Sequence, residues 1–273
     1  MTTPTGAQSQ AEASAPASQV RARTGAPARY AALDLGTNNC RLLIAEPDPA
    51  GFRVIDAFSR NVRLGEGVET HGELSRAAMS RTIDALRICA SKIRPHEVSR
   101  CRIVATEACR RAANARGFLR RVRRETGLEM EVITPEQEAR LALAGCAPLL
   151  DEAAQSLMVF DIGGGSTELI WIDLLGCAPK DRQDLILALA PGRGGPDRSE
   201  LRRAARERIV DWISAPVGVA TLHARYAHAE DDADPDALMA CHFERHTSGF
   251  PPHADATAAA TPPARPTPRA SGT

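Results

Sequence analysis

One short pattern occurs twice in this chain, and it constrains the fold more than any other feature. The first copy runs from Leu33 to Ile44 and the second from Phe160 to Trp171. In each copy an apolar strand ends in Asp, passes through a turn of Gly and small polar residues, and returns as a second apolar strand. This duplication predicts two similar halves that face each other across a cleft, each with a phosphate-sized turn and a carboxylate beside it.

Both turns have the composition of an anion-binding site. A phosphate needs several hydrogen-bond donors at close range, and glycine lets the backbone approach closely and adopt positive φ. The second turn adds two hydroxyl groups, and the first uses Asn amides where the second has Gly. The residues predicted to bind phosphate are Gly36, Thr37, Asn38, Asn39, Gly163, Gly164, Gly165, Ser166 and Thr167.

Carboxylates beside the two turns predict a magnesium site. Asp34 and Asp161 end the strands that lead into the turns, and Glu168 starts the second return strand. Such carboxylates bind magnesium directly or through its water ligands. For either turn alone, a plain hairpin is an equally good interpretation, because short Gly-rich motifs are common. The same flanking strands around both turns favour phosphate binding.

Composition excludes several classes of function. Lys plus Arg and Asp plus Glu both total 34, so a zero net charge predicts no general attraction to nucleic acid or membranes. The seven cysteines lack CxxC spacing, which argues against a zinc site or disulfide framework and predicts that most are buried thiols in a reducing cytosol. No signal peptide and no apolar stretch of about 20 residues is present, so we expect a cytoplasmic protein.

The alternation of strands and helices predicts an α/β architecture. We expect a disordered tail over 1–28, a first lobe over 29–150, a partial second lobe over 151–245 and a second disordered tail over 246–273. Strands are predicted at 30–35, 40–46 and 52–58 as an antiparallel meander, and at 101–105, 130–133, 157–161, 168–173 and 208–214. Helices are predicted at 75–93, 114–125, from 134 onward and at 217–226, with a loop insertion over 176–200 around an apolar run at 185–190.

Side chains that can cap helices mark three of these helix starts. Ser75 is the predicted N-cap of the helix at 75–93, and Asn114 that of the helix at 114–125. Thr134 is followed by Pro135 and Gln137, which together predict a capping box. Arginines crowd residues 110–124, where a solvated helix face is the simpler interpretation and a track for a polyanion the alternative.

Several motifs, in order along the chain, resemble those of the exopolyphosphatase and guanosine pentaphosphate phosphohydrolase family, a branch of the actin-like ATPase superfamily. The two turns are similar to the phosphate motifs of the family. Between and after them lie Ala105-Thr106 with Arg110 and Asn114, Pro135 to Arg140, and Ser214 to Leu222. The resemblance implies a two-lobed, actin-like (ribonuclease H-like) fold with mixed sheets.

The resemblance also implies a role for individual residues. Glu138 matches the general base that activates water, Arg110 matches an arginine that holds a phosphate, and Asp161 and Glu168 match metal-site carboxylates, with Asp34 beside them. These residue types suit phosphoryl hydrolysis, which needs a positioned proton acceptor and neutralisation of charge on the phosphoryl oxygens. Each has a structural alternative: a carboxylate early in a helix is favoured by the helix dipole, and an arginine can serve as a cap or an ion-pair partner.

One departure from the family concerns the second lobe. A further Gly-Thr-Ser-Gly-Thr type motif is missing, and Thr247-Ser248-Gly249 lies in a Pro-rich context instead. We therefore expect an apparently truncated second lobe with exposed apolar surface, which makes a homodimer plausible.

The predicted function is magnesium-dependent release of a terminal phosphate from inorganic polyphosphate or guanosine pentaphosphate. The expected partners are these polyphosphates, with no nucleic acid and no membrane. A catalytically inactive protein that binds polyphosphate or a nucleotide is the main alternative. A phosphotransferase similar to sugar kinases is a third, disfavoured because it needs an adenosine pocket from the second lobe.

Overall fold

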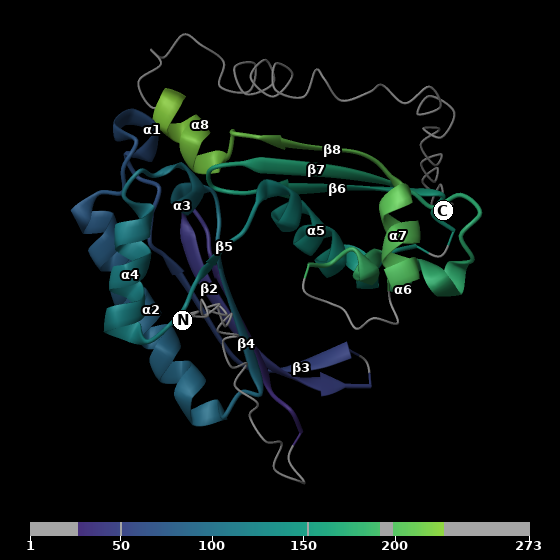
Figure 1. Ribbon diagram of the computed structural model, residues 1–273, viewed down its shortest axis with the longest axis horizontal. Helices are drawn as coiled ribbons and strands as arrows, with labels where there is room; N and C mark the ends of the chain where they lie inside the picture. Colours follow the sequence, from purple (N-terminus) through teal and green to yellow (C-terminus); the bar gives the residue numbers. More distant parts are fainter. Residues whose placement is uncertain (1–26, 50, 152, 192–198, 227–273) are drawn as a thin grey trace, which may run out of the picture.

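The computed structural model describes residues 27–49, 51–151, 153–191 and 199–226, and Figure 1 shows their arrangement. Its strands are β1 (Tyr30–Leu35), β2 (Asn39–Asp48), β3 (Gly51–Asn61), β4 (Arg100–Ala105), β5 (Glu131–Val132), β6 (Ser156–Ile162), β7 (Thr167–Asp173) and β8 (Ile209–Ala215). Its helices are α1 (Val68–His71), α2 (Arg76–Ile93), α3 (Glu107–Arg111), α4 (Ala115–Thr126), α5 (Pro135–Cys146), α6 (Pro179–Ala188), α7 (Ser199–Glu207) and α8 (Val219–Tyr226), with short 3-10 helices at Arg94–His96 and Ala147–Leu149.

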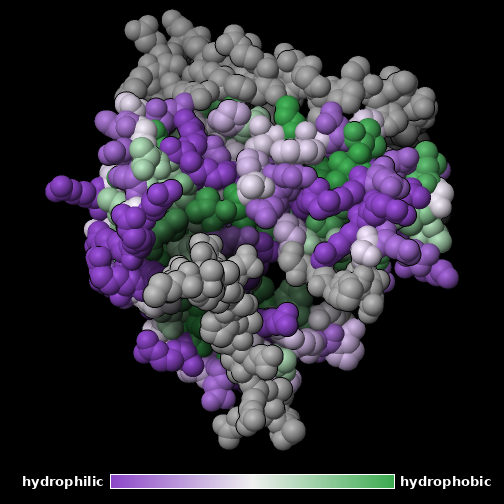
Figure 2. Space-filling view, viewed as in Figure 1, coloured by the Kyte–Doolittle hydropathy of each residue, from purple (hydrophilic) through white to green (hydrophobic). Residues whose placement is uncertain are grey.

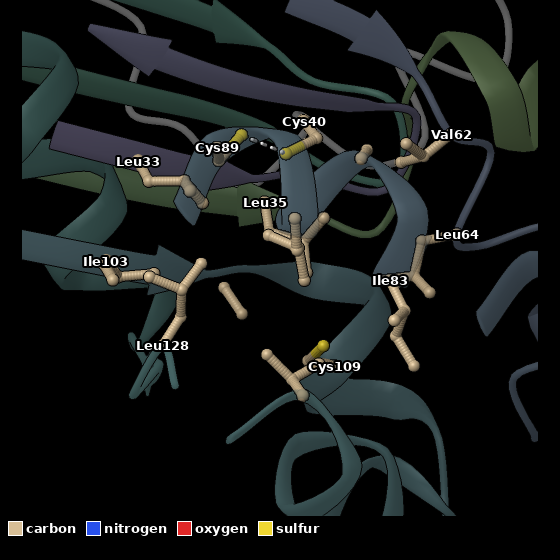
Figure 3. Packing of buried hydrophobic residues seen from close by; sticks show 14 of the residues in the cluster. Leu33, Leu35, Cys40, Val62, Leu64, Ile83, Cys89, Ile103, Cys109 and Leu128 are labelled. Atoms are coloured by element: carbon tan, nitrogen blue, oxygen red, sulfur yellow. Dashed lines mark hydrogen bonds between the residues drawn. The ribbon is translucent and has the colours of Figure 1, made fainter. Parts of the chain in front are cut away.

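The first sheet is mixed and has the order β3-β2-β1-β4-β5. The predicted meander is confirmed, because β2 pairs antiparallel with both β1 and β3. β4 pairs parallel with β1 and β5, since α2 and α4 provide the crossovers that parallel strands require. Leu33 and Leu35 of β1 pack with Ile83 of α2 in the first core, where the Sγ atoms of Cys40 and Cys89 also lie 3.9 Å apart (Figure 3).

The second sheet is antiparallel and has the order β6-β7-β8. α5 packs on it and contributes Ala139 and Leu143 to a second core with Val159, Ile170 and Ile172. Packing therefore assigns α5 to the second sheet, although the first predicted lobe runs to residue 150. In Figure 1, α2 and α4 lie on the outer side of the first sheet, and α5, α6 and α7 lie beside the second.

The segment predicted as a loop over 176–200 is the main error of the sequence analysis. It holds α6 and the first residues of α7, and Leu185 and Ile186 of α6 are buried in the second core. Pro179 stands in the first turn of α6, where its missing amide costs no helical hydrogen bond. The apolar residues of α6 gather in one run near its end, so no apolar stripe at helical spacing marks its first half.

All three predicted residues occupy the N-cap positions of their helices, but only two of them cap with the side chain. Ser75 accepts a hydrogen bond from Ala78 N, and Thr134 forms the full capping box with Gln137. Asn114 is the N-cap residue of α4, but its side chain accepts no hydrogen bond from the first turn of the helix. Its amide instead exchanges two hydrogen bonds of 2.9 Å with the backbone of Leu74, a partner 40 residues away that no local pattern reveals.

The expected fold class, α/β with a mixed sheet in an actin-like arrangement, is confirmed. Cys40, Cys89 and Cys109 are buried as expected, whereas Cys101 is exposed. Within the described ranges, no helix is both long and apolar enough to cross a membrane. Apart from residues 27 and 28, the two tails predicted to be disordered lie outside the described residues.

Hydrophilic side chains gather on the side of the molecule that carries α2 and α4 (Figure 2). Four arginines of α4 are exposed there, namely Arg116, Arg120, Arg123 and Arg124. Their exposure agrees with a solvated helix face. Arg110 does not belong to this face, because its side chain is largely buried.

Candidate active site

The two turns of the duplicated pattern line one shared cavity of about 390 Å³. Asp34 and Asp161 face this cavity from the ends of β1 and β6, and Glu138 reaches it from the first turn of α5. The predicted phosphate residues that line it are Gly36, Thr37, Asn38, Asn39, Gly163, Gly164, Gly165 and Ser166. Residues far apart in sequence thus meet because two equivalent hairpins approach each other tip to tip.

Equivalent hydrogen bonds close the two turns. Gly36 N donates to Asn39 O across 2.9 Å, and Gly163 N donates to Ser166 O across 2.8 Å. Further amides at the turn tips have no hydrogen-bond partner within the described part of the chain: those of Thr37, Asn38, Gly164, Gly165 and Ser166. Unpaired amides grouped around a cavity are donors for an anion.

Close packing, and not positive φ, explains why glycine occupies the second turn. None of Gly163, Gly164 and Gly165 adopts a positive φ, so that part of the prediction is wrong. A Cβ atom on Gly165 would lie 2.6 Å from Thr37 Oγ1, and one on Gly164 would lie 3.2 Å from Asn38 N. The two turns touch each other, and only residues without a side chain fit between them.

The segment between β8 and α8 holds the second turn in place. Val219 N donates to Gly163 O across 3.0 Å, and Ala220 N donates to Gly164 O across 2.9 Å. Gly218 packs so closely that a Cβ there would lie 2.5 Å from the carbonyl carbon of Gly164. The N-terminal amides of α8 thereby fix the backbone of the turn from behind.

The carboxyl group of Glu138 has a raised pKa. Burial, helped by the nearby carboxylates of Glu168 and Asp161, raises its pKa to about 7, while Arg110 opposes the shift. A group with a pKa near neutrality can accept a proton and release it again at physiological pH. The capping box of Thr134 and Gln137 fixes the start of α5 and so the direction of this side chain.

Arg110 lies behind Glu138 and does not line the cavity. Its Nη1 donates to Glu138 Oε2 across 2.7 Å and to Ile133 O across 2.9 Å. Its Nε donates to Glu107 Oε2 across 3.0 Å. Two of its three nitrogens thus orient Glu138 and bind Glu107, whereas Nη2 is buried without a hydrogen-bond partner.

Arg41 is a site residue that the sequence analysis missed. It follows the first turn on β2 and lines the cavity, as does the buried Thr106 at the end of β4. Burial raises the pKa of both Asp34 and Asp161, and the positive charge of Arg41 opposes this rise. In the second hairpin Glu168 occupies the place that corresponds to Arg41, so comparing the two copies gave no signal for an arginine.

Glu168 and Thr167 lie in β7, outside the cavity lining. Glu168 is only 1% exposed, and its Oε1 accepts a hydrogen bond of 2.9 Å from Ser214. Burial raises the pKa of Glu168, and hydroxyl groups oppose the rise. Thr167 donates its hydroxyl to Val217 O across 2.6 Å, so this hydroxyl holds the β7–α8 region together and is not free for a phosphate.

The carboxyl groups at the site could bind magnesium if water and substrate phosphates supplied its other ligands. Four carboxyl groups with raised pKa values, those of Asp34, Glu138, Asp161 and Glu168, gather in and behind one cavity, and Glu168 Oε2 is buried without a hydrogen-bond partner. Within the described residues, no three such side chains form a ready-made metal cluster. Magnesium commonly uses one or two carboxylates together with water and substrate phosphates, which this arrangement permits.

The fold and the cavity define an α/β protein of the actin-like class in which two duplicated hairpins line a cavity rich in carboxylates. The chain matches the Ppx/GppA phosphatase family over residues 43–241. It belongs to that family.

Solved structures of relatives agree with this assignment. The Ppx/GppA family member from Aquifex aeolicus is 31% identical with a TM-score of 0.56, over 81% of this chain and 62% of that one. An exopolyphosphatase from Cytophaga hutchinsonii, 24% identical over 80% of this chain and 60% of that one, has a TM-score of 0.62 and supports the fold alone. This chain thus spans about three fifths of the length of these relatives.

Proposed function

We propose that this chain hydrolyses the terminal phosphoryl group of inorganic polyphosphate or of guanosine pentaphosphate. The observation that carries the proposal is the position of Glu138, a carboxyl group with a pKa near 7, in the cavity that both turns line. A proton acceptor next to unpaired backbone amides is the arrangement that phosphoryl hydrolysis needs.

In the proposed mechanism, the amides of the two turns donate hydrogen bonds to the terminal phosphoryl oxygens. These donors are fixed before the substrate arrives, so little reorganisation is needed as charge develops in the transition state. Glu138 accepts the proton of the attacking water. Arg110 is a positioning residue in this scheme, because it orients Glu138 through the 2.7 Å hydrogen bond and keeps the pKa of Glu138 from rising further.

We further propose that the reaction depends on magnesium held by Asp161, with Asp34 close by. Several carboxylates around one cavity repel a polyanion, and Arg41 supplies only one positive charge in the lining. A bound magnesium ion would neutralise negative charge on the phosphoryl oxygens. Asp161 is the preferred ligand because it lines the cavity, whereas Glu168 lies behind it.

Phosphate release by the purified chain tests the proposal. The chain is mixed with polyphosphate or guanosine pentaphosphate, with magnesium or with EDTA, and free phosphate is measured. We expect release that requires magnesium and is lost in Glu138→Gln. Asp161→Asn is expected to raise the magnesium concentration needed for half-maximal release.

Binding is measured in parallel by calorimetry with the same substrates. Tight binding without any release would favour the catalytically inactive binding protein over the hydrolase. Magnesium-independent release, or full activity of Glu138→Gln, would refute the mechanism. Activity on only one of the two substrates would identify which of them the site accepts.

A further inference from the structure

A second cavity, of about 460 Å³, adjoins the cavity that holds Glu138. We call these two spaces the outer cavity and the catalytic cavity. Thr37, Asn38 and Gly165 of the turn tips line both, whereas Glu138 lines only the catalytic cavity. The loop that follows β3 forms the other walls of the outer cavity together with α1, α3 and the start of α8, which lie close together in Figure 1. A phosphoryl group bound at the turn tips would therefore border both cavities.

The outer cavity is where the leaving group of the proposed reaction belongs. In phosphoryl transfer the attacking and leaving oxygens lie roughly in line, on opposite sides of the phosphorus. Water activated by Glu138 attacks from the catalytic cavity, so the leaving group departs toward the outer cavity. In inorganic polyphosphate and in guanosine pentaphosphate this leaving group begins with a phosphate, which gains negative charge as the phosphoanhydride bond breaks.

Arg63 supplies the positive charge that is available in the outer cavity. Within the described residues its exposed side chain has no ion-pair partner. The other arginine of the lining, Arg111, lies 3.7 Å from Glu69 and 3.9 Å from Glu107. The remaining carboxylate of the lining, that of Glu66, forms an ion pair of 2.5 Å with an arginine outside it. The charge of Arg63 is thus left for a bound anion.

The backbone of Arg63 is attached to the first turn in a conformation that residues with a side chain rarely adopt. Its φ is 47°, in the left-handed region. The amides of Val62 and Arg63 donate to Asn38 O across 2.8 and 2.9 Å, and Gly65 N donates to Thr37 O across 2.9 Å. Glycine adopts such a φ without strain, yet an arginine stands here. Strained residues cluster at functional sites, so the strain indicates a function of the side chain.

We propose that Arg63 binds the phosphate next to the terminal one, which is the leaving group of the reaction; this inference rests on the proposed function. The water oxygen bonds to the terminal phosphorus and its proton passes to Glu138, while the bond from that phosphorus to the bridging oxygen breaks. The bridging oxygen keeps the electron pair and leaves on the shortened chain. The guanidinium of Arg63 donates hydrogen bonds to the oxygens of this leaving phosphate, because its planar fork matches them.

Calorimetry with the full chain tests this assignment. Inorganic phosphate occupies only the turns, whereas tripolyphosphate and guanosine pentaphosphate also reach the outer cavity. The measurements use Glu138→Gln as background, with magnesium present, so that no ligand is hydrolysed. Adding Arg63→Gln should weaken the binding of tripolyphosphate and guanosine pentaphosphate about tenfold or more, the effect of one lost hydrogen bond to a charged group. The binding of inorganic phosphate should not change.

Two further variants separate the side chain from the backbone and from total charge. Arg63→Gly adopts the φ of 47° without strain, so it should keep the unfolding temperature of the parent and lose as much tripolyphosphate affinity as Arg63→Gln. Arg120→Gln is the matched control for the loss of one positive charge. Arg120 is exposed on α4 and lines neither cavity, so its substitution should leave all three affinities unchanged.

Several results would overturn the proposal. Unchanged tripolyphosphate binding in Arg63→Gln, or no tripolyphosphate binding by the parent, would show that Arg63 holds no second phosphate. An equal loss for inorganic phosphate would show that Arg63 acts on the turns. A loss with only one of the two longer ligands would support the proposal for that ligand alone. Phosphate release is assayed separately with the wild-type chain, so binding that depends on Arg63 without any release would refute the proposed function and leave the binding role of Arg63 in place.

Discussion

Arg110 and Glu138 lie 28 residues apart in sequence, and Nη1 of the arginine donates to Oε2 of the glutamate across 2.7 Å. The arginine comes from α3 and the glutamate from α5, so this bond links the helix that follows β4 to the helix that packs on the second sheet. A hydrogen bond that is also an ion pair restricts the carboxyl group to one orientation. The candidate base is therefore held by both halves of the molecule.

Replacing Glu138 should separate chemistry from binding. We expect Glu138→Ala to lower the rate of phosphate release by a factor on the order of 10² to 10⁴, the usual contribution of a general base. Binding of polyphosphate should change little, because the backbone amides of the turns remain. Release is measured by a phosphate assay and binding by calorimetry. An equal loss of binding would show that Glu138 holds the substrate and does not activate water.

The rate of phosphate release should rise with pH through about 7. Glu138 accepts a proton only when it is ionised, and burial raises its pKa to about 7. Arg110 lowers that pKa, so Arg110→Gln should move the rising limb of the pH profile to higher pH. Arg87→Gln is the matched control, because Arg87 forms ion pairs with Asp84 and Glu125 on the surface. An unmoved profile in Arg110→Gln would contradict the positioning role.

Stability should fall as pH rises from about 4.5 to about 7, with Glu138 as one cause. Its pKa is about 7 in the folded chain and 4.5 without the fold, so the folded chain binds the extra proton within this window. The loss of stability across this window is up to about 3 kcal/mol, and above it both states are ionised and the contribution changes no further. Glu138→Gln does not titrate and should gain stability relative to the wild-type chain as pH rises. Urea unfolding of both proteins at pH 5 and pH 8 measures the difference, and an equal difference at both values would contradict the assignment.

Close packing behind the second turn predicts an effect of Gly218→Ala. The new Cβ would lie 2.6 Å from the carbonyl oxygens of Gly163 and Gly164, so the turn backbone must move. We expect a loss of about 1–3 kcal/mol in the free energy of unfolding, together with slower phosphate release.

Gly145→Ala is the control for this substitution. Gly145 lies in α5 with nothing near the position of an added Cβ, so alanine there should stabilise the chain by about 0.5–1 kcal/mol. Thermal unfolding of both variants compares them. Equal stability of the two would mean that the turn has room for a side chain.

Local patterns predicted most of the elements and the central feature of the site. The apolar strand segments predicted the antiparallel meander. The capping box predicted the start of α5, which carries Glu138 in its first turn. The sequence-based prediction was wrong where a helix or a contact depends on residues that are distant in the chain or lacks an apolar stripe. α6 has its apolar residues in one run, and Asn114 finds its partner 40 residues away. Arg41 was not predicted as a site residue because the second copy of the pattern has no arginine at the corresponding place.

The sequence by itself determined that two matching hairpins with Asp34 and Asp161 at their strand ends would form, because strand and turn preferences act over a few neighbouring residues. It also determined the family, through motifs that keep their order along the chain. Only the tertiary structure decided which groups share the cavity, what Arg110 holds and why the second turn is glycine. Those properties depend on distances between residues far apart in the chain, and burial and packing in three dimensions set them.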